Sequence, residues 1–295
     1  MFEGRTKMKT MFAKDLQEKK RHGSIMFPFN IYPCTIPKDF RDVPIHWQES
    51  MEIIFIKKGK GYAQVDTQWQ NVESGTIYVV PPGTLHALKE MPGYSMEYEN
   101  IIFELGILGR DAADICAQEY LIPLAAGKLI QPLILKEGNR GYDDVKLILN
   151  ETERLCGAKM HGYELSVKAM MLQILFLLLQ NYPEKPKDDS ANTERLKQVL
   201  QKLDEEYTEH LTIDMMAKAV GCSASHFMKW FKQMTGTSFG TFMNDKRLAM
   251  AAHRLKETDE KILTIAANAG FENLSNFNRQ FKNRYGMTPR QYRNN

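Results

Sequence analysis

Residues 217–236 read AKAVGCSASHFMKWFKQMTG, and residues 266–286 read AANAGFENLSNFNRQFKNRYG. The second stretch repeats the first: an alanine, a glycine, two phenylalanines, a lysine and a final glycine return in the same order, with one extra residue between them. A repeat with a period of about 50 residues indicates one structural unit built twice. The residues within each copy show what kind of unit it is.

Each copy predicts a short helix, a turn and a second helix. Ile213 to Val220 and Ile262 to Ala269 carry apolar residues along one side of a helix. The glycine that follows each of them can adopt the positive φ that ends a helix. Ser223 and Asn273 are good N-caps for the next helix. In that helix the two phenylalanines are four residues apart, so they share its buried face.

The opposite face of each second helix is polar and basic. No acidic residue occurs between Asp214 and Asp245, nor from Asn273 to Asn295, which contains five arginines and lysines. Small, polar and cationic side chains suit the base edges and phosphates of DNA, so the repeat predicts two helix-turn-helix units. The alternative is a helical-hairpin repeat that binds protein, but such solenoids normally need three or more copies.

The segment from Leu211 to Arg293 resembles the DNA-binding domain of AraC/XylS-type transcription regulators. The likeness rests on Gly221-Cys222-Ser223, Phe231-Lys232-x3-Gly236, Ile265-Ala266, Gly270-Phe271, Phe277-x-Arg279-x-Phe281-Lys282 and Gly286-Met287-Thr288-Pro289-x2-Tyr292-Arg293. It implies two helix-turn-helix subdomains joined by a long helix at about 239–256, with both recognition helices in successive major grooves. The residues expected at the DNA are Ser223, Ser225, Lys229, Lys232, Asn273, Leu274, Ser275, Asn278, Arg279 and Lys282.

Leu274 departs from the family pattern, which usually has a polar residue at this position. Its side chain would either pack on a thymine methyl group or contribute nothing to base recognition.

The charge of the chain is distributed unevenly. The 295 residues carry a net charge of +3, but from Thr193 onward there are 16 basic and 11 acidic residues, against 23 and 25 before it. A basic part beside a mildly acidic one hints at a polyanion partner. The four cysteines are scattered without metal-type spacing, and no secretory leader is evident, so we expect a cytoplasmic protein.

Residues from about 26 to 105 contain short strand-like runs broken by glycine and proline. Examples are Glu52 to Lys57, Gly61 to Val65 and Thr76 to Val80, with a turn at Asp66-Thr67-Gln68. This spacing predicts a small barrel or sandwich.

Two segments of this region resemble the paired motifs of cupin barrels: His46-x-Gln48-x3-Glu52-x6-Gly59 and Gly75-x5-Pro81-x-Gly83-x2-His86. Metal-binding cupins have a second histidine where this chain has Gln48, which leaves His46, Glu52 and His86 as a reduced ligand set. We therefore expect no metal and no cofactor. The residues expected to line an effector pocket are His46, Trp47, Gln48, Glu52, Tyr78 and His86.

Three uses of the barrel remain open: an effector pocket of polar and aromatic groups, a metal site, and a purely structural barrel with His86 as a core histidine. The likeness to AraC-type sensors favours the effector pocket. An enzyme would be a cupin oxygenase or isomerase fused to a DNA-binding domain, because no Ser-His-Asp order, P-loop or dinucleotide-binding motif occurs. We expect no catalytic residue.

From about residue 108 the pattern becomes helical. Asp143 to Leu155 is amphipathic, and Tyr163 to Tyr182 is apolar around most of its circumference, which indicates cover by its own domain or by a partner subunit. Lys168 and Gln173 interrupt its most apolar stretch, so we expect no membrane span. Prolines and charges at 183–192 predict a linker.

These patterns together predict an α+β chain. Residues 1–182 would form a cupin-like effector-binding and dimerisation domain, with a barrel at about 26–105 and helices at about 108–182, and residues 193–295 the double helix-turn-helix domain. The expected function is transcription regulation at a DNA operator. The resemblance further implies a homodimer that responds to a small molecule, a carbohydrate by preference, and activates a catabolic operon through RNA polymerase.

Overall fold

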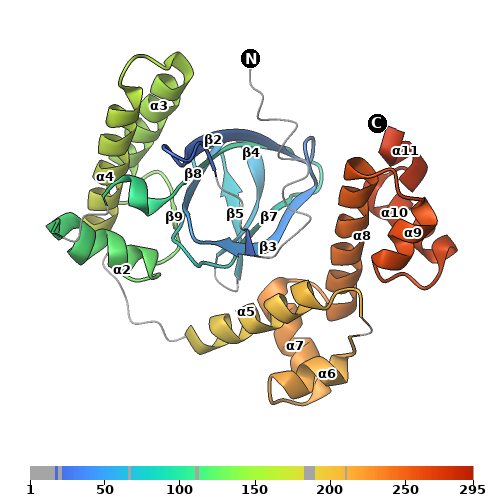
Figure 1. Ribbon diagram of the computed structural model, residues 1–295. Coiled ribbons are helices and arrows are strands. Elements are labelled where there is room, and N and C mark those ends of the chain that lie inside the picture. Colours follow the sequence, from blue (N-terminus) through green and yellow to red (C-terminus); the bar gives the residue numbers. More distant parts are fainter. Residues whose placement is uncertain are drawn as a thin grey trace. The chain divides into compact units, whose positions relative to one another are not determined.

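The computed structural model describes residues 17–18, 22–65, 68–109, 113–182, 190–209 and 211–294. They form two compact units, one of strands and helices that ends with the helix at Tyr163–Asn181, and one that is helical from Ser190 onward. Figure 1 shows the barrel of the first unit from its end and the helices of the second. The predicted α+β class, with a cupin-like barrel and a helical C-terminal domain, is confirmed.

Among the described residues, nine strands build the barrel, and all their pairings except that of β1 with β3 are antiparallel. The strands are β1 Gln17–Glu18, β2 Phe29–Ile36, β3 Asp42–Gln48, β4 Met51–Val65, β5 Gln68–Glu73, β6 Ile77–Val80, β7 His86–Glu90, β8 Met96–Phe103 and β9 Leu133–Leu135.

Strand β4 belongs to both sides of the barrel. Its first half pairs with β6 and β8, and its second half pairs with β5 and β7. The change of partners falls next to Gly59, which has a φ of +77°, and a Cβ there would lie 1.8 Å from the carbonyl oxygen of Ser95. Only glycine fits this corner, where the strand turns and closes the barrel.

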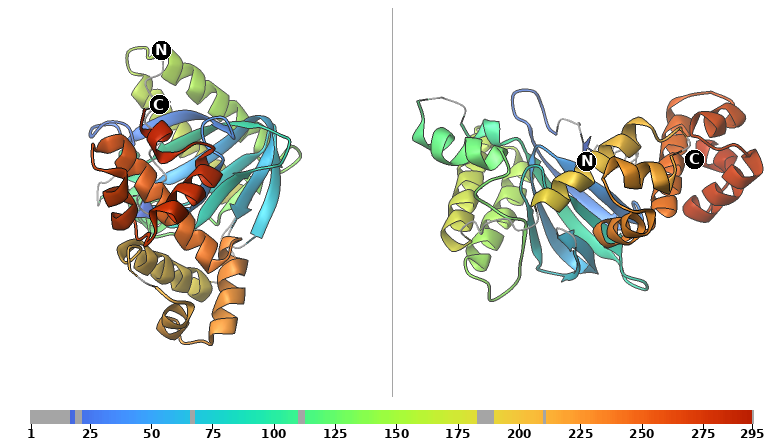
Figure 2. Two further views of the ribbon diagram at one scale, coloured as in Figure 1. Left: turned by 90° about the vertical axis from the view of Figure 1, so that its right-hand side faces the viewer. Right: turned by 90° about the horizontal axis from the view of Figure 1, so that it is seen from below.

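Helices α3 (Tyr142–Ala158) and α4 (Tyr163–Asn181) cover the outer face of the sheet, and all views show them on this side of the barrel (Figures 1 and 2). Their buried residues form one hydrophobic cluster with alternate residues of β4, Ile53 and Phe55. The predicted buried stripe of α3 is confirmed, because Val145, Ile148, Leu149, Thr152 and Leu155 are buried.

An ion cluster also connects α3 with the sheet. Lys57 Nζ of β4 lies 2.8 Å from Glu153 Oε2 of α3 and 3.4 Å from Glu99 Oε2 of β8. Burial and the neighbouring Glu153 carboxyl raise the pKa of Glu99 to about 7, against the opposing effect of Lys57.

Of the described helices, α4 alone is long and apolar enough to cross a membrane by length and composition. A helix in a protein core passes the same test. Val167, Met171 and Ile174 are fully buried against the barrel, whereas Leu165 and Phe176 are 75% and 58% exposed.

The sequence pattern missed parts of the first unit. Two of the expected strands, Glu52 to Lys57 and Gly61 to Val65, are halves of β4, since a bent strand continues through Gly59. The expected helical region contains β9, which adds an edge to β6, and the short elements η2 (Ala117–Leu121) and α2 (Ile122–Ala125). Another short element, η1 (Leu105–Ile107), lies just before this region. Of the expected turn, Gln68 lies in β5, and Asp66 and Thr67 lie outside the described residues.

The second unit consists of helices: α5 Ser190–Glu205, α6 Ile213–Ala219, α7 Ala224–Thr235, α8 Phe239–Glu257, α9 Ile262–Asn268, α10 Leu274–Tyr285 and α11 Pro289–Asn294. The long helix expected at about 239–256 is α8, within one residue of its end. Helix α5 begins inside the segment 183–192 that the sequence indicates as a linker. It is part of this unit, because Asp204 pairs with Lys246 of α8 and Arg195 donates to the Val220 carbonyl.

Candidate nucleic-acid interface and buried polar cluster

Side-chain caps start both predicted recognition helices, α7 and α10. Ser223 Oγ accepts a hydrogen bond from the backbone N–H of His226 at 3.3 Å. Asn273 Oδ1 accepts from the N–H of Ser275 at 2.8 Å and of Asn276 at 3.1 Å. Gly221 and Gly270, with φ of +66° and +84°, make the turns that precede them. Both units therefore have the helix-turn-helix geometry that the sequence predicts.

The two phenylalanines of each recognition helix fix which face points outward. Phe227, Phe231, Phe277 and Phe281 are each 0% exposed, and the ring centroids within the pairs are 5.5 Å and 5.4 Å apart. Trp230 and Met234 of α7 are buried on the same side, so each helix presents its opposite face to solvent.

All ten residues that the sequence predicts at the DNA are exposed, beside others such as Met228, which is 46% exposed. Arg279 extends from α10 and donates to Asn276 Oδ1 at 2.9 Å. Leu274 keeps 36% of its surface exposed. The exposed residues of this set are Ser223, Ser225, Lys229, Lys232, Asn273, Leu274, Ser275, Asn278, Arg279 and Lys282.

Not every cation of this unit is available for DNA. Arg247 of α8 donates to the carbonyl oxygens of Tyr207 and Glu209, both at 2.8 Å, and so holds the segment after α5. Arg254 is paired with Glu260 at 2.6 Å. The charge count of the sequence could not separate these structural cations from those on α7 and α10.

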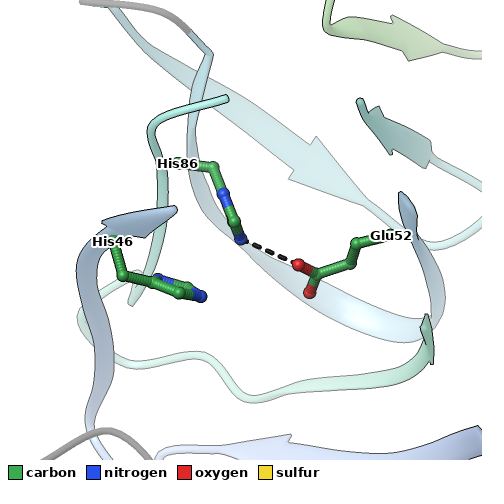
Figure 3. Close-up of side chains that lie close together, drawn as sticks. All are labelled: His46, Glu52 and His86. Atoms are coloured by element: carbon green, nitrogen blue, oxygen red, sulfur yellow. Dashed lines mark ion pairs between the residues drawn. The ribbon is translucent and has the colours of Figure 1, made fainter. Parts of the chain in front are cut away.

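A second candidate site lies inside the barrel. His46 of β3 and His86 of β7 are paired across the two strands, and their ring centroids are 4.1 Å apart. Glu52 of β4 completes the group, with Oε2 2.8 Å from His86 Nε2. Figure 3 shows both imidazoles directed towards this carboxylate. All three side chains are nearly inaccessible to solvent, so the two cupin-like motifs meet as the sequence analysis expects.

Backbone hydrogen bonds fix the orientation of both imidazoles. His46 Nδ1 lies 3.0 Å from the Pro44 carbonyl oxygen, and His86 Nδ1 lies 2.9 Å from that of Thr84. A carbonyl oxygen can only accept, so each Nδ1 carries a proton and each Nε2 is directed into the barrel.

The charges of the cluster follow from burial and from each other. Burial and the charge of His86 lower the pKa of His46 to about 4, so this imidazole is neutral near pH 7. Burial alone would lower the pKa of His86 and raise that of Glu52. Their mutual attraction outweighs burial and shifts both in the opposite direction, which leaves a buried imidazolium–carboxylate pair.

Of the other predicted residues, Gln48 contacts this pair. Gln48 Nε2 donates to Glu52 Oε2 at 2.5 Å. Tyr78 is buried, and its hydroxyl donates to the Gln64 carbonyl at 2.7 Å. Trp47 is adjacent to His46 and Gln48 in β3, so strand alternation places it on the opposite face of that strand, away from the cluster.

Three participants were missed by the sequence analysis. Asn100 of β8 is buried and hydrogen-bonds with Glu52. Glu18 of β1 lies 3.8 Å from His46 Nε2 through Oε2 and 3.3 Å from His22 Nε2 through Oε1. No local motif marks these residues, because strand pairing between distant segments brings them to the site.

Cupin barrels imply a metal ion, and the donor groups here fit one. The ligating atoms of His46, Glu52 and His86 all lie within 4.8 Å of one another. Both histidines direct Nε2 inward while Nδ1 is held by a carbonyl, which is the arrangement of metal-binding histidines. These three residues would hold the ion, which would supply a positive charge that attracts a ligand oxygen.

Comparison with known proteins matches both units. A family model described as a helix-turn-helix domain matches residues 216–295, and one described as a cupin domain matches residues 34–93. The first range contains all ten residues expected at the DNA, and the second contains His46, Glu52 and His86.

Relatives resemble the chain over nearly its whole length. It is 23% identical over 288 residues to the uncharacterized HTH-type transcriptional regulator YdeC of Bacillus subtilis (strain 168), covering 95% of this chain and 96% of that protein. It is 26% identical over 257 residues to the HTH-type transcriptional regulator MtrA of Neisseria gonorrhoeae, covering 81% and 84%. A similar solved structure is ToxT from Vibrio cholerae O395, with 14% identity, a TM-score of 0.43 and coverage of 90% and 96%.

Arg279 and Lys282 provide a test of base recognition on α10. Both are exposed, but we expect Arg279 to bind guanine O6 and N7, a contact worth about 1–3 kcal/mol of base discrimination, and Lys282 to bind a phosphate. Arg279→Ala should relax the selected sequence at one or two base pairs. Lys282→Ala should weaken binding for all sequences alike. It should also reduce the slope of log K against the logarithm of salt concentration by about one.

Binding-site selection with both variants and the parent chain measures this difference. A sequence preference of Arg279→Ala identical to that of the parent, with only the overall affinity reduced, would show that Arg279 contacts the DNA backbone alone.

Proposed function

This chain is a DNA-binding transcriptional regulator of the AraC type with a cupin domain, and we propose that its barrel binds a small polar effector that controls DNA binding. The effector contacts the buried cluster of His46, Gln48, Glu52 and His86. The chain works as a homodimer, and the recognition helices α7 and α10 of each subunit bind the operator.

The observation that carries this proposal is the polar interior of the barrel. A barrel with a purely structural role is filled most cheaply by apolar side chains, because burying charged groups costs free energy. Here a carboxylate, two imidazoles and two amides face one interior. Among the described residues, Gln48 Oε1 and Asn100 Oδ1 are buried without a hydrogen-bond partner, and such groups are rare unless something else binds them.

The chemistry of these groups favours a hydroxyl-rich effector. Gln48 and Asn100 offer acceptors, and the two imidazoles and the carboxylate offer donors and acceptors close together. A carbohydrate has hydroxyl groups that both donate and accept at this spacing. We therefore propose a sugar or oligosaccharide, in line with the likeness to AraC-type sensors.

A short route connects this cluster to α3. Successive residues of β8 point to opposite faces of the strand. Asn100 accordingly faces Glu52 inside the barrel, while Glu99 faces Lys57 and, through it, Glu153 of α3. A shift of β8 on effector binding would thus act on the helices that we assign to dimerisation.

The exposed apolar face of α4 supports the homodimer. Leu172 and Phe176 keep 38% and 58% of their surfaces exposed. They border a cavity of about 350 Å³ between α4 and the segment of η2 and α2, lined almost entirely by apolar side chains. Exposed apolar patches of this kind mark interaction surfaces. Leu175, which the sequence pattern places on the same face, is only 4% exposed and packs in the core.

The remaining parts of the proposal rest on the likeness to the family. We propose that the chain acts in the cytoplasm, contacts RNA polymerase and activates a catabolic operon. We also propose that it is not an enzyme, since its relatives carry the names of transcriptional regulators. The competing function is a cupin oxygenase or isomerase, which the metal-type geometry of His46, Glu52 and His86 favours.

Glu52→Gln tests the effector site. A panel of sugars is first screened by the thermal shift of the full chain, since a ligand at 100 times its Kd stabilises by about 2.7 kcal/mol. Loss of the charged hydrogen bonds of Glu52 should then weaken binding of the identified effector by about 10- to 100-fold. DNA affinity without effector should stay unchanged.

The matched control is Glu73→Gln, which removes an exposed carboxylate from β5 of the same barrel. If no sugar stabilises the chain, the carbohydrate assignment is wrong. If Glu52→Gln binds the effector with the same affinity as the control, the effector binds elsewhere.

Phe176→Asp tests the dimer. A charge at the centre of the exposed face of α4 should weaken association by about 2 kcal/mol, roughly 30-fold in Kd, as measured by sedimentation. Ile25→Asp, at an apolar residue that is 79% exposed before β2, serves as the control and should sediment as the parent does. A folded Phe176→Asp variant that remains fully dimeric would refute the assignment.

A further inference from the structure

Strand β1 brings a carboxylate to the position where the metal-binding pattern is incomplete. Glu18 is the register partner of Gln48 in the parallel pairing of β1 with β3. Gln48 is the residue that replaces the second histidine of the cupin pattern. Glu18 Oε2 lies 3.8 Å from His46 Nε2, and the Glu18 side chain is only 7% exposed.

A third histidine, His22, lies beside this carboxylate. His22 is 2% exposed, with Nδ1 3.1 Å from the Tyr32 hydroxyl and Nε2 3.3 Å from Glu18 Oε1. With Oε1 turned to His22, Oε2 is the oxygen that faces His46 and the interior. Partners of this kind fix the ligands of metal sites in a productive orientation.

The Glu18 carboxylate lies outside the group of ligand atoms that are within 4.8 Å of one another. We propose that it moves onto the ion and completes a four-ligand site for a divalent transition metal with His46, Glu52 and His86. Two imidazole nitrogens and two carboxylate oxygens suit zinc and the other first-row divalent ions. The inference rests on the proposed role of the cluster as a binding site.

Metal binding then has a mechanical consequence. The ion joins β1 to β3, β4 and β7, which supply the other three ligands. Since β1 is only two residues long, its pairing with β3 contributes little on its own. The metal therefore stabilises the association of β1 with the barrel. A metal site formed by the two cupin-like motifs alone would have no ligand on β1.

The test uses the full chain, freed of metal by a chelator. Zn²⁺ binding is measured by calorimetry, and Co²⁺ binding by its visible absorption, which reports the number and kind of ligands. We expect one ion per chain, with Zn²⁺ displacing Co²⁺. Glu18→Gln should weaken Zn²⁺ binding by about 10- to 100-fold and change the Co²⁺ absorption spectrum. Glu73→Gln should leave the Zn²⁺ affinity and the Co²⁺ spectrum unchanged. Hydrogen exchange of peptides containing residues 17–18 should slow with Zn²⁺ in the parent and not in Glu18→Gln.

Folding of each variant is checked by its thermal transition without metal. Glu18→Asp keeps the charge on a shorter side chain, so its Zn²⁺ affinity should lie between those of the parent and Glu18→Gln. Absence of stoichiometric binding to the parent would overturn the metal site. Parent-like binding by Glu18→Gln would overturn the role of Glu18. The sugar screen, repeated with chelator present, separates the two proposals: a sugar response without metal binding refutes only this inference.

Discussion

Both sites depend on the burial of apolar side chains at the regular spacing that strands and helices impose. Along β4, Ile53 and Phe55 pack outward against α3 and α4, and strand alternation then turns Glu52 into the barrel. Along α7 and α10, two phenylalanines per helix are fully buried, and the helical repeat leaves the polar and basic residues outside. The position of each functional side chain is thus a consequence of its apolar neighbours. Gly59 adds the corner that lets β4 serve both halves of the barrel and close it around the cluster.

The two sites differ in how electrostatics acts on them. On α7 and α10 the cations are exposed and carboxylates are absent from the sequence of both helices, so their attraction for phosphates acts through solvent and is weakened by salt. Inside the barrel, His86 and Glu52 are removed from water and hold each other ionised, which makes any further polar group or ion in that space interact strongly. The first site is therefore suited to a large polyanion, and the second to a small ligand.

The sequence predicted what local patterns encode. The helix caps Ser223 and Asn273 and the helical stripe of α3 follow from short-range spacing, while the bounds of α8 follow from the family resemblance. The structure confirms all of them. It did not predict β9 or the continuity of β4, because edge pairing and a bend at a glycine depend on distant strands. For the same reason Glu18, His22 and Asn100 were missed: each reaches the cluster through the barrel, far in sequence from the two cupin-like motifs. Trp47, chosen for its aromatic ring, lies on the opposite face of β3 from the cluster, since a strand alternates its side chains.

The central claim is that one chain reads DNA with two helices, α7 and α10, presented by equivalent units. Hydroxyl-radical footprinting of the full chain on a selected binding site tests this most directly. Two helices in successive major grooves should protect two stretches of backbone on the same side of the duplex, about one helical turn of 10–10.5 base pairs apart for each bound subunit. A single protected stretch per subunit would contradict the account, because one of the two units would then have no contact with DNA.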